Sequence, residues 1–220
     1  MTARGPLRLA ILISGRGSNM ATIARACAEK RLHANVEAVI SDRPDAAGLE
    51  TARGFGIATA VVPWKSLADR ATAEQVLGEL IDAHRPDCVL LAGFMRILSG
   101  EFAARHAGRM LNIHPALLPA YRGLHTHRRV LEAAEKQHGA SVHFVTEELD
   151  GGPVVLQSRI AVRPGESESA LMARVQKTEH IIYPRVLEWL AEGRLVWRNA
   201  QPWLDGRPLD QPVVQEFPDV

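Results

Sequence analysis

Short apolar runs alternate with helical patterns over the first half of the chain, and this alternation restricts the possible folds most. Each run is short and mostly apolar, which is typical of a strand. Strands separated by helices form βαβ units, which build a doubly wound, mostly parallel sheet. We therefore predict an α/β, Rossmann-like fold with strands at residues 8–14, 36–41, 57–62, 87–92 and 110–114, and helices at 18–30, 46–55, 66–84, 99–106 and 127–138.

The second half of the chain departs from this alternation. Two strand-like runs, at residues 140–146 and 154–162, are joined by a turn with two glycines and a proline, which indicates an antiparallel or mixed edge of the sheet. A long helix is expected from Glu168 to Ala191, with Pro184 as a kink. We assign residues 1–209 to a single domain and the polar residues 210–220 to a loose C-terminal tail.

The composition limits the classes of partner. The chain of 220 residues carries 26 basic and 25 acidic side chains, so its formal net charge of +1 favours neither nucleic acid nor a membrane surface as partner. No stretch reaches the roughly 20 apolar residues of a membrane span. The first six residues are too short for a signal peptide, so we expect a cytoplasmic protein.

The cysteines and histidines give no sign of a metal site. Cys88 lies in an apolar run and Cys27 in a helical pattern, so neither a disulfide framework nor a cysteine-ligated metal is indicated. His125 and His127 lack a cysteine or carboxylate partner at a familiar spacing. We expect no metal, and we assign these two histidines to loop structure and the shape of a substrate site.

Asn112 and His114 are the strongest candidates for chemistry. They lie two residues apart at the end of an apolar strand, so their side chains share one face. The carboxamide can stabilise an oxyanion while the imidazole exchanges a proton. If the glycine-rich turn after residue 149 folds back onto the strand end, Asp150 can orient the imidazole. Taken alone, such a pair is more often a chance feature of a strand end, because histidines often only satisfy local hydrogen bonds.

Two loops are expected beside this pair, because ligands of open α/β sheets bind beyond the carboxyl ends of the strands. Residues 14–19 join the first strand to the first helix, where backbone amides favour a phosphate. The loop is no P-loop, and Met20 breaks the dinucleotide pattern, so it is either a monophosphate site or an ordinary turn. Residues 93–98 offer either a slot for a flat heterocycle or core packing.

Three long and specific motifs, at residues 112–119, 123–127 and 149–153, carry a family resemblance. Together they resemble the folate-dependent formyltransferases, most closely the members that formylate glycinamide ribonucleotide (GAR) in purine synthesis. The likeness extends from about Leu9 to Leu209. It implies direct transfer of a formyl group from the co-substrate 10-formyltetrahydrofolate to the GAR amine, with two small-molecule partners, no metal, and a monomeric or homodimeric enzyme.

The resemblance also implies roles for individual residues. Asn112, His114 and Asp150 would be catalytic. Without the resemblance, Glu179 would be one more charge on an amphipathic helix and Arg70 a solvated surface residue. The residues expected to bind GAR are Gly17, Ser18, Asn19, Gln176 and Glu179. The residues expected to bind the folate are Arg70, Met95, Arg96, Ile97, Leu98, Asn112, Thr146, Glu147, Glu148, Leu149 and Asp150.

Residues 120–122 depart from the family pattern, and Arg122-Gly123 is similar to the methionyl-tRNA formyltransferases. That enzyme is one alternative, although the nearly neutral net charge gives no sign of a basic surface that would bind tRNA. Formyltetrahydrofolate hydrolase, which gives the formyl group to water, is a second. A nucleotide-binding module without catalysis is a third, because the βα pattern and Asp42 after the second strand permit it.

Overall fold

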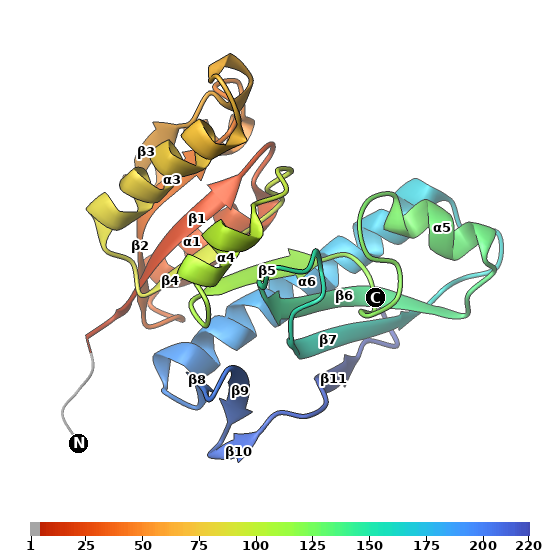
Figure 1. Cartoon of the computed structure of the whole chain (residues 1–220). Coiled ribbons are helices and arrows are strands. Elements are labelled where there is room, and N and C mark those ends of the chain that lie inside the picture. The colour runs from red at the N-terminus through yellow and green to blue at the C-terminus, as the bar shows by residue number, and fades with distance from the viewer. Residues whose placement is uncertain (1–4) are drawn as a thin grey trace.

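The computed structural model describes residues 5–220 and places eight of their strands in one sheet and three in another (Figure 1). The large sheet has the order β11-β7-β6-β5-β4-β1-β2-β3. Its strands are β1 (Leu7–Ile13), β2 (Ala34–Ser41), β3 (Ala58–Val61), β4 (Cys88–Leu91), β5 (Met110–His114), β6 (Gln137–Phe144), β7 (Val154–Ala161) and β11 (Val213–Glu216). The first four residues of the predicted domain, and with them most of the segment judged too short for a signal peptide, lie outside the described residues.

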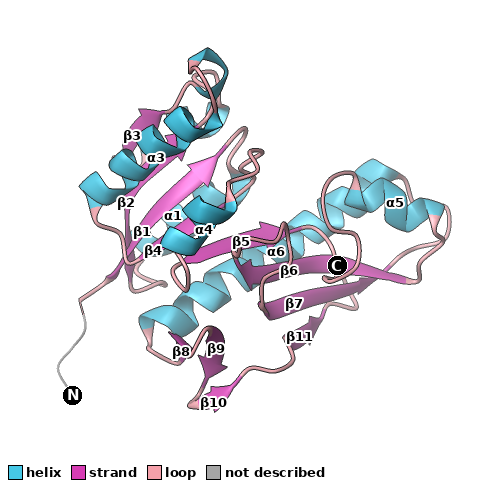
Figure 2. Ribbon diagram, viewed as in Figure 1, coloured by secondary structure: helices cyan, strands magenta, loops and turns pink. Residues whose placement is uncertain are grey.

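Helices cover both faces of this sheet, as Figure 2 shows. They are α1 (Ser18–Ala28), α2 (Ala47–Gly54), α3 (Arg70–His84), α4 (Gly100–Arg105), α5 (Thr126–Glu132) and α6 (Glu168–Ala191), with a short 3-10 helix at Trp64–Ser66. Alternate side chains of β1 belong to two separate cores. Ile11 packs with α1, α2 and α6, and Leu12 packs with α3 and α4 on the opposite face. Burial on both faces explains why β1 reads as a continuous apolar run.

The five neighbouring strands β5, β4, β1, β2 and β3 run parallel, which confirms the doubly wound prediction. The sheet order reverses at β1, where β2 pairs on one side and β4 on the other, so the carboxyl ends of β1 and β4 border a crevice. The predicted mixed edge is also confirmed. β6 pairs antiparallel with both β5 and β7, and the edge strand β11 returns to a parallel pairing with β7.

Two helix boundaries were predicted wrongly. The helix expected at 66–84 begins at Arg70, because the Asp69 carboxylate accepts a hydrogen bond from the Thr72 amide at 2.7 Å and caps the helix there. The helix expected at 127–138 ends at Glu132, and Ala134 adopts a φ of 52°. The chain is then free to enter β6 at Gln137, three residues before the predicted strand.

The predicted loose tail at residues 210–220 is the third error. Val213–Glu216 forms β11, and Phe217 and Val220 pack against the core. The Val220 carbonyl oxygen accepts a hydrogen bond from Arg174 Nε at 2.7 Å. The chain reaches this edge through an antiparallel sheet that the sequence analysis did not predict, formed by β8 (Leu195–Arg198), β9 (Gln201–Leu204) and β10 (Arg207–Pro208).

Helix α6 packs across one face of the large sheet, against β6 and β7 (Figure 1). It is a single helix of 24 residues with Pro184 inside it. The buried Tyr183 hydroxyl lies 3.2 Å from the Leu91 carbonyl oxygen and 3.1 Å from that of Leu111, so it ties α6 to β4 and β5. None of the helices between residues 5 and 220 is long and apolar enough to cross a membrane.

Candidate active site

The predicted pair lies at the carboxyl end of β5, where the strand is held between β4 and β6. His114 is the last residue of β5, and Asn112 lies on the same face two residues earlier. His114 is 6% exposed, whereas Asn112 is only partly buried. The strand predicted at 110–114 is thus confirmed, and it presents a carboxamide and an imidazole side by side.

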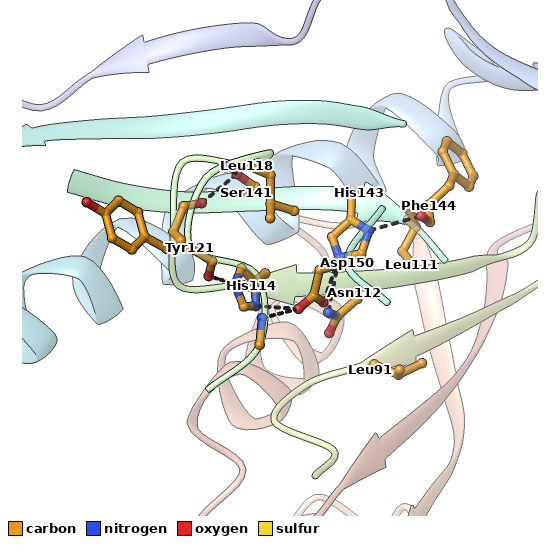
Figure 3. A network of polar contacts seen from close by, with 12 residues as sticks. Leu91, Leu111, Asn112, His114, Leu118, Tyr121, Ser141, His143, Phe144 and Asp150 are labelled. Carbon is orange, nitrogen blue, oxygen red and sulfur yellow. Dashed lines mark hydrogen bonds and ion pairs between the residues drawn. The ribbon is translucent and has the colours of Figure 1, made fainter. Parts of the chain in front are cut away.

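His114 lies between a carbonyl and a carboxylate, as Figure 3 shows. Its Nε2 lies 3.0 Å from the Tyr121 carbonyl oxygen, which can only accept a hydrogen bond. Its Nδ1 lies 3.4 Å from Asp150 Oδ2, and both side chains are less than a tenth exposed. Each ring nitrogen therefore faces an oxygen atom, which fixes the orientation of the ring and suits a group that exchanges protons.

Asp150 reaches His114 because of the turn that follows it. Asp150 itself has a φ of 49°, a left-handed conformation that Asp tolerates better than most residues. Gly152 lies so close to β6 that a Cβ atom there would be 1.9 Å from the Phe144 carbonyl oxygen. Any side chain at this position would push the turn away from the sheet. The glycine therefore holds the carboxylate against the end of β5.

His143 is a site residue that the sequence analysis missed. Its Nδ1 donates to its neighbour's carbonyl oxygen, Phe144 O, at 3.0 Å, so Nε2 is the acceptor for Asn112 Nδ2 at 3.1 Å. Burial lowers the pKa of His143 to about 4, which keeps the ring neutral and able to accept. His143 lies directly opposite Asn112 in the antiparallel register of β5 and β6. The pairing register of β5 and β6 would identify His143 as the neighbour of Asn112, but this register is known only once the two strands are paired.

A mostly apolar cavity of about 470 Å³ opens beside these residues. Met95 and Ile97 line it while remaining 63% and 60% exposed, so they form a wide apolar mouth rather than part of the core. This shape suits a flat ring system with a few polar groups. The predicted folate residues that line the cavity are Met95, Arg96, Ile97, Leu98, Asn112, Thr146, Glu147, Glu148, Leu149 and Asp150.

Two predicted folate residues have other partners. Arg70 is not among the lining residues of the cavity. It is the first residue of α3, its side chain is 58% exposed, and its Nε lies 3.8 Å from Glu74 Oε1. Arg96 lines the cavity, but its Nε donates to the buried Asp42 at 2.6 Å. The positive charge of Arg96 is therefore matched by a carboxylate that the sequence analysis considered only for a nucleotide-binding module.

The predicted GAR residues come together across α1 and α6. Asn19 Nδ2 donates to Glu179 Oε2 at 2.8 Å, and Gln176 Nε2 donates to Ser18 Oγ at 3.0 Å. Burial raises the pKa of Glu179, and the hydrogen bond from Asn19 partly offsets this effect. Gly17, with a φ of 68°, precedes α1, and no side chain caps this helix end. The first amides of α1 are thus available to an anion.

Other nucleophiles and metal ligands are poorly placed. Burial raises the pKa of the Cys27 thiol to about 11 and that of Cys88 to about 12, so neither forms a thiolate near neutrality. Within residues 5–220, no three His, Cys, Asp or Glu side chains gather as a metal site. His125 and His127 line the cavity, and His127 Nδ1 lies 3.0 Å from His138 Nε2.

Comparisons with known proteins agree with this geometry. Residues 7–187 match the family model described as formyl transferase. The chain is 51% identical to the phosphoribosylglycinamide formyltransferase of Escherichia coli (strain K12), over 92% of this chain and 96% of that protein. It is 41% identical to the Haemophilus influenzae protein of the same name, over 92% and 95% of the two chains.

Among solved structures, the phosphoribosylglycinamide formyltransferase of Coxiella burnetii has a TM-score of 0.90 at 45% identity. The alignment covers 95% of this chain and 99% of that one. Agreement over almost the whole length of both chains extends the likeness beyond the shared α/β architecture. The chain therefore belongs to the formyl transferase family and, within it, to the phosphoribosylglycinamide formyltransferases.

Proposed function

We propose that this enzyme transfers the formyl group of 10-formyltetrahydrofolate to the primary amine of GAR in de novo purine biosynthesis. The observation that carries the proposal is the contact of His114 Nδ1 with Asp150 Oδ2 at 3.4 Å, beside an apolar cavity that Asn112 also lines. This arrangement offers a proton donor and an amide donor at one point. Acyl transfer to an amine needs both, because it passes through a tetrahedral oxyanion.

We propose that the folate and GAR approach from two sides. The pterin ring would enter the 470 Å³ cavity, which the segments 95–98 and 146–150 line. The phosphate of GAR would bind at the amino end of α1, next to Gly17, Ser18 and Asn19, and its ribose would face Gln176 and Glu179. The Met95 amide donates to Ser14 Oγ at 2.8 Å, so the two loops that carry these subsites are in contact. This contact supports a single reaction centre.

In the first chemical step, the amine nitrogen of GAR attacks the formyl carbon, and the carbonyl π electrons move to the formyl oxygen. Asn112 Nδ2 has two hydrogens, and His143 accepts one of them. The second is free to stabilise the oxyanion. His143 fixes the direction of this donor before the substrate arrives, which lowers the cost of organising the transition state.

In the second step, the oxyanion re-forms the carbonyl double bond while the bond between the formyl carbon and folate N10 breaks, and N10 takes a proton. His114 supplies this proton as an imidazolium that Asp150 stabilises, and the proton lost by the amine returns to the ring through a water molecule. The transfer requires the ring to exchange its contact with the Tyr121 carbonyl for a substrate atom or that water. No covalent enzyme intermediate is needed.

The test is an acceptor assay with the purified protein and 10-formyltetrahydrofolate, in which either GAR or water alone is offered as acceptor. We expect tetrahydrofolate to form at a catalytic rate only when GAR is present. Release of formate at a comparable rate without GAR would instead show a hydrolase, and formylation of methionyl-tRNA in a parallel reaction would show the other alternative.

Ligand-induced changes in the melting temperature distinguish a nucleotide-binding module without catalysis from the proposed enzyme. A folate analogue and a ribonucleotide monophosphate should each raise the melting temperature, whereas a dinucleotide should leave it unchanged. Stabilisation by the dinucleotide alone would contradict the proposal. The cytoplasmic location and the monomeric or homodimeric state stay predictions, and light scattering on the purified protein tests the second.

A further inference from the structure

Two loops meet over the contact between His114 and Asp150. We call residues 115–125, between β5 and α5, the proline loop, and residues 145–153, between β6 and β7, the aspartate loop. The Gly123 amide in the proline loop donates to Asp150 Oδ2 in the aspartate loop at 2.9 Å. The same carboxylate oxygen faces His114 Nδ1. The position of Asp150 therefore depends on how the two loops sit against one another.

Arg122 provides a second link between the loops. Its Nη1 forms an ion pair with Glu148 Oε1. Arg122 precedes Gly123 in the chain, and Glu148 lies two residues before Asp150, so the ion pair and the Gly123 hydrogen bond form a two-point attachment. Arg122 Nε is buried, which shows that the side chain lies against the loops rather than extending into solvent.

The proline loop is itself held in place, so the ion pair has a fixed anchor. Arg129 of α5 donates to the Arg122 carbonyl oxygen at 2.7 Å, and its guanidinium lies 5.2 Å from the centre of the Tyr121 ring. The Tyr121 hydroxyl donates to Glu135 at 2.7 Å. In the aspartate loop, Glu148 is exposed, and Arg122 is the partner that its carboxylate has in the folded protein. Of the two loops, the aspartate loop is the one that the ion pair can restrain.

We propose that Arg122 is a positioning residue that acts through Glu148 to keep Asp150 facing His114. The inference rests on the proposed function, because it assumes that the contact between Asp150 and His114 drives formyl transfer. Arg122 touches no reacting atom. It stands in residues 120–122, the segment where the sequence departs from the family pattern.

The exposure of the pair sets the expected size of the effect. The side chains of Arg122 and Glu148 are 35% and 66% exposed, and an ion pair in that environment adds little to global stability. Its expected effect is instead local, on how firmly Glu148 and, two residues later, Asp150 are held relative to His114. We therefore expect a loss of about three- to tenfold in kcat, with an unchanged melting temperature.

The chain contains a matched control. Arg159 forms an ion pair with Glu216 at 2.9 Å, its side chain is 32% exposed and that of Glu216 is 60% exposed. Arg159 Nε is also buried without a partner, as Arg122 Nε is. This pair joins β7 to β11 at the edge of the sheet, outside the cavity-lining segments. Arg159→Met removes the same groups as Arg122→Met without touching either loop.

The experiment measures kcat and both KM values for the wild type, Arg122→Met, Glu148→Gln, the double variant, Arg122→Lys and Arg159→Met. We expect both single variants at the ion pair to lose three- to tenfold in kcat with an unchanged KM for GAR. The double variant should be no slower than the slower single variant. Arg122→Lys should keep at least half of the wild-type kcat, and Arg159→Met should match the wild type.

Three outcomes would overturn the proposal: additive losses in the double variant, a kcat within twofold of wild type in Arg122→Met, or an equal loss in Arg159→Met. In Arg122→Met, a loss confined to the KM of the formyl donor would also overturn it, because Arg122 would then contact the donor directly. The wild-type protein separates this result from the parent proposal. If the wild type forms no formyl-GAR, the proposed function fails, whereas an active wild type with an unaffected Arg122→Met removes only the positioning role.

Discussion

Asp150 Oδ2 faces two donors at once, the Gly123 amide at 2.9 Å and His114 Nδ1 at 3.4 Å. The amide fixes the oxygen in space, and the oxygen in turn orients the imidazole. The remaining ring nitrogen, Nε2, already lies against the Tyr121 carbonyl. His114 is thus oriented by partners from both of its sides before any substrate binds, which is the condition for efficient proton transfer.

Replacing the carboxylate of Asp150 should affect the reaction far more than the fold. Asp150→Asn keeps an oxygen that can accept from Gly123, but it removes the charge that stabilises the imidazolium. We expect kcat to fall by about two orders of magnitude, within the usual range for acid-base groups. Thermal unfolding should change by only a few degrees. Asp210→Asn, at an exposed residue, is the control, and equal activity of the two variants would contradict the assignment.

The role of His143 can be tested through the hydrogen-bond acceptor that it offers to Asn112. His143→Leu removes the acceptor, so the Asn112 amide loses its fixed direction. We expect kcat to drop roughly tenfold, the effect of one oriented hydrogen bond. His143→Gln can present a carbonyl oxygen to Asn112 and should recover part of this loss. Steady-state kinetics of the two variants provide the check, and wild-type kcat in both would rule the role out.

Glu179 should contribute to binding of GAR rather than to the chemical step. Glu179→Gln keeps an oxygen acceptor for Asn19 but removes the charge that would meet the ribose hydroxyls. We expect the KM for GAR to rise roughly tenfold while kcat and the KM for the formyl donor stay near the wild-type values, because a uniform binding contribution is lost. A fall in kcat at an unchanged KM for GAR would place Glu179 in the chemistry instead.

Buried histidines should make the fold sensitive to acid. Burial lowers the pKa of His106 and His143 to about 4 and that of His138 to about 3, from an ordinary value of 6.5. At a pH between the lowered and the ordinary pKa, the unfolded chain binds more protons than the folded one. The free energy of unfolding therefore keeps its full value above pH 6.5 and falls as the pH drops. Each histidine can remove roughly 1 kcal/mol per pH unit in that window. Urea unfolding at pH 7 and pH 5 measures the loss, and equal midpoints would contradict it.

Much of the fold was predictable because it follows from local pattern. β1 packs on both faces and therefore reads as a continuous apolar run, and β5 carries Asn112 and His114 at its end. The tail was mispredicted for the opposite reason. β11 has only four residues, and it is stable because it pairs with β7 and because Arg174 binds the Val220 carbonyl. Those partners are distant in sequence, so no local signal reveals them.

The site residues also fall into two groups, those that a local motif reveals and those that only distant partners define. Asn112, His114 and Asp150 lie in motifs that can be recognised along the chain, and the structure places them together. His143 becomes visible only when β6 is aligned with β5, because its partner Asn112 is 31 residues away. The ion pair of Arg122 with Glu148 depends on two loops that meet only in the folded protein. Contacts of this kind can be recognised only in the folded structure.

A single-turnover experiment measures the proton transfer assigned to His114 without interference from product release. Enzyme in excess is mixed with 10-formyltetrahydrofolate and GAR, and the formation of formyl-GAR is followed for the wild type and for His114→Ala, whose melting temperature is measured in parallel. We expect the chemical step to slow at least about a hundredfold in the variant while the fold is retained. A folded His114→Ala that formylates GAR within threefold of the wild-type rate would show that His114 is not the proton donor.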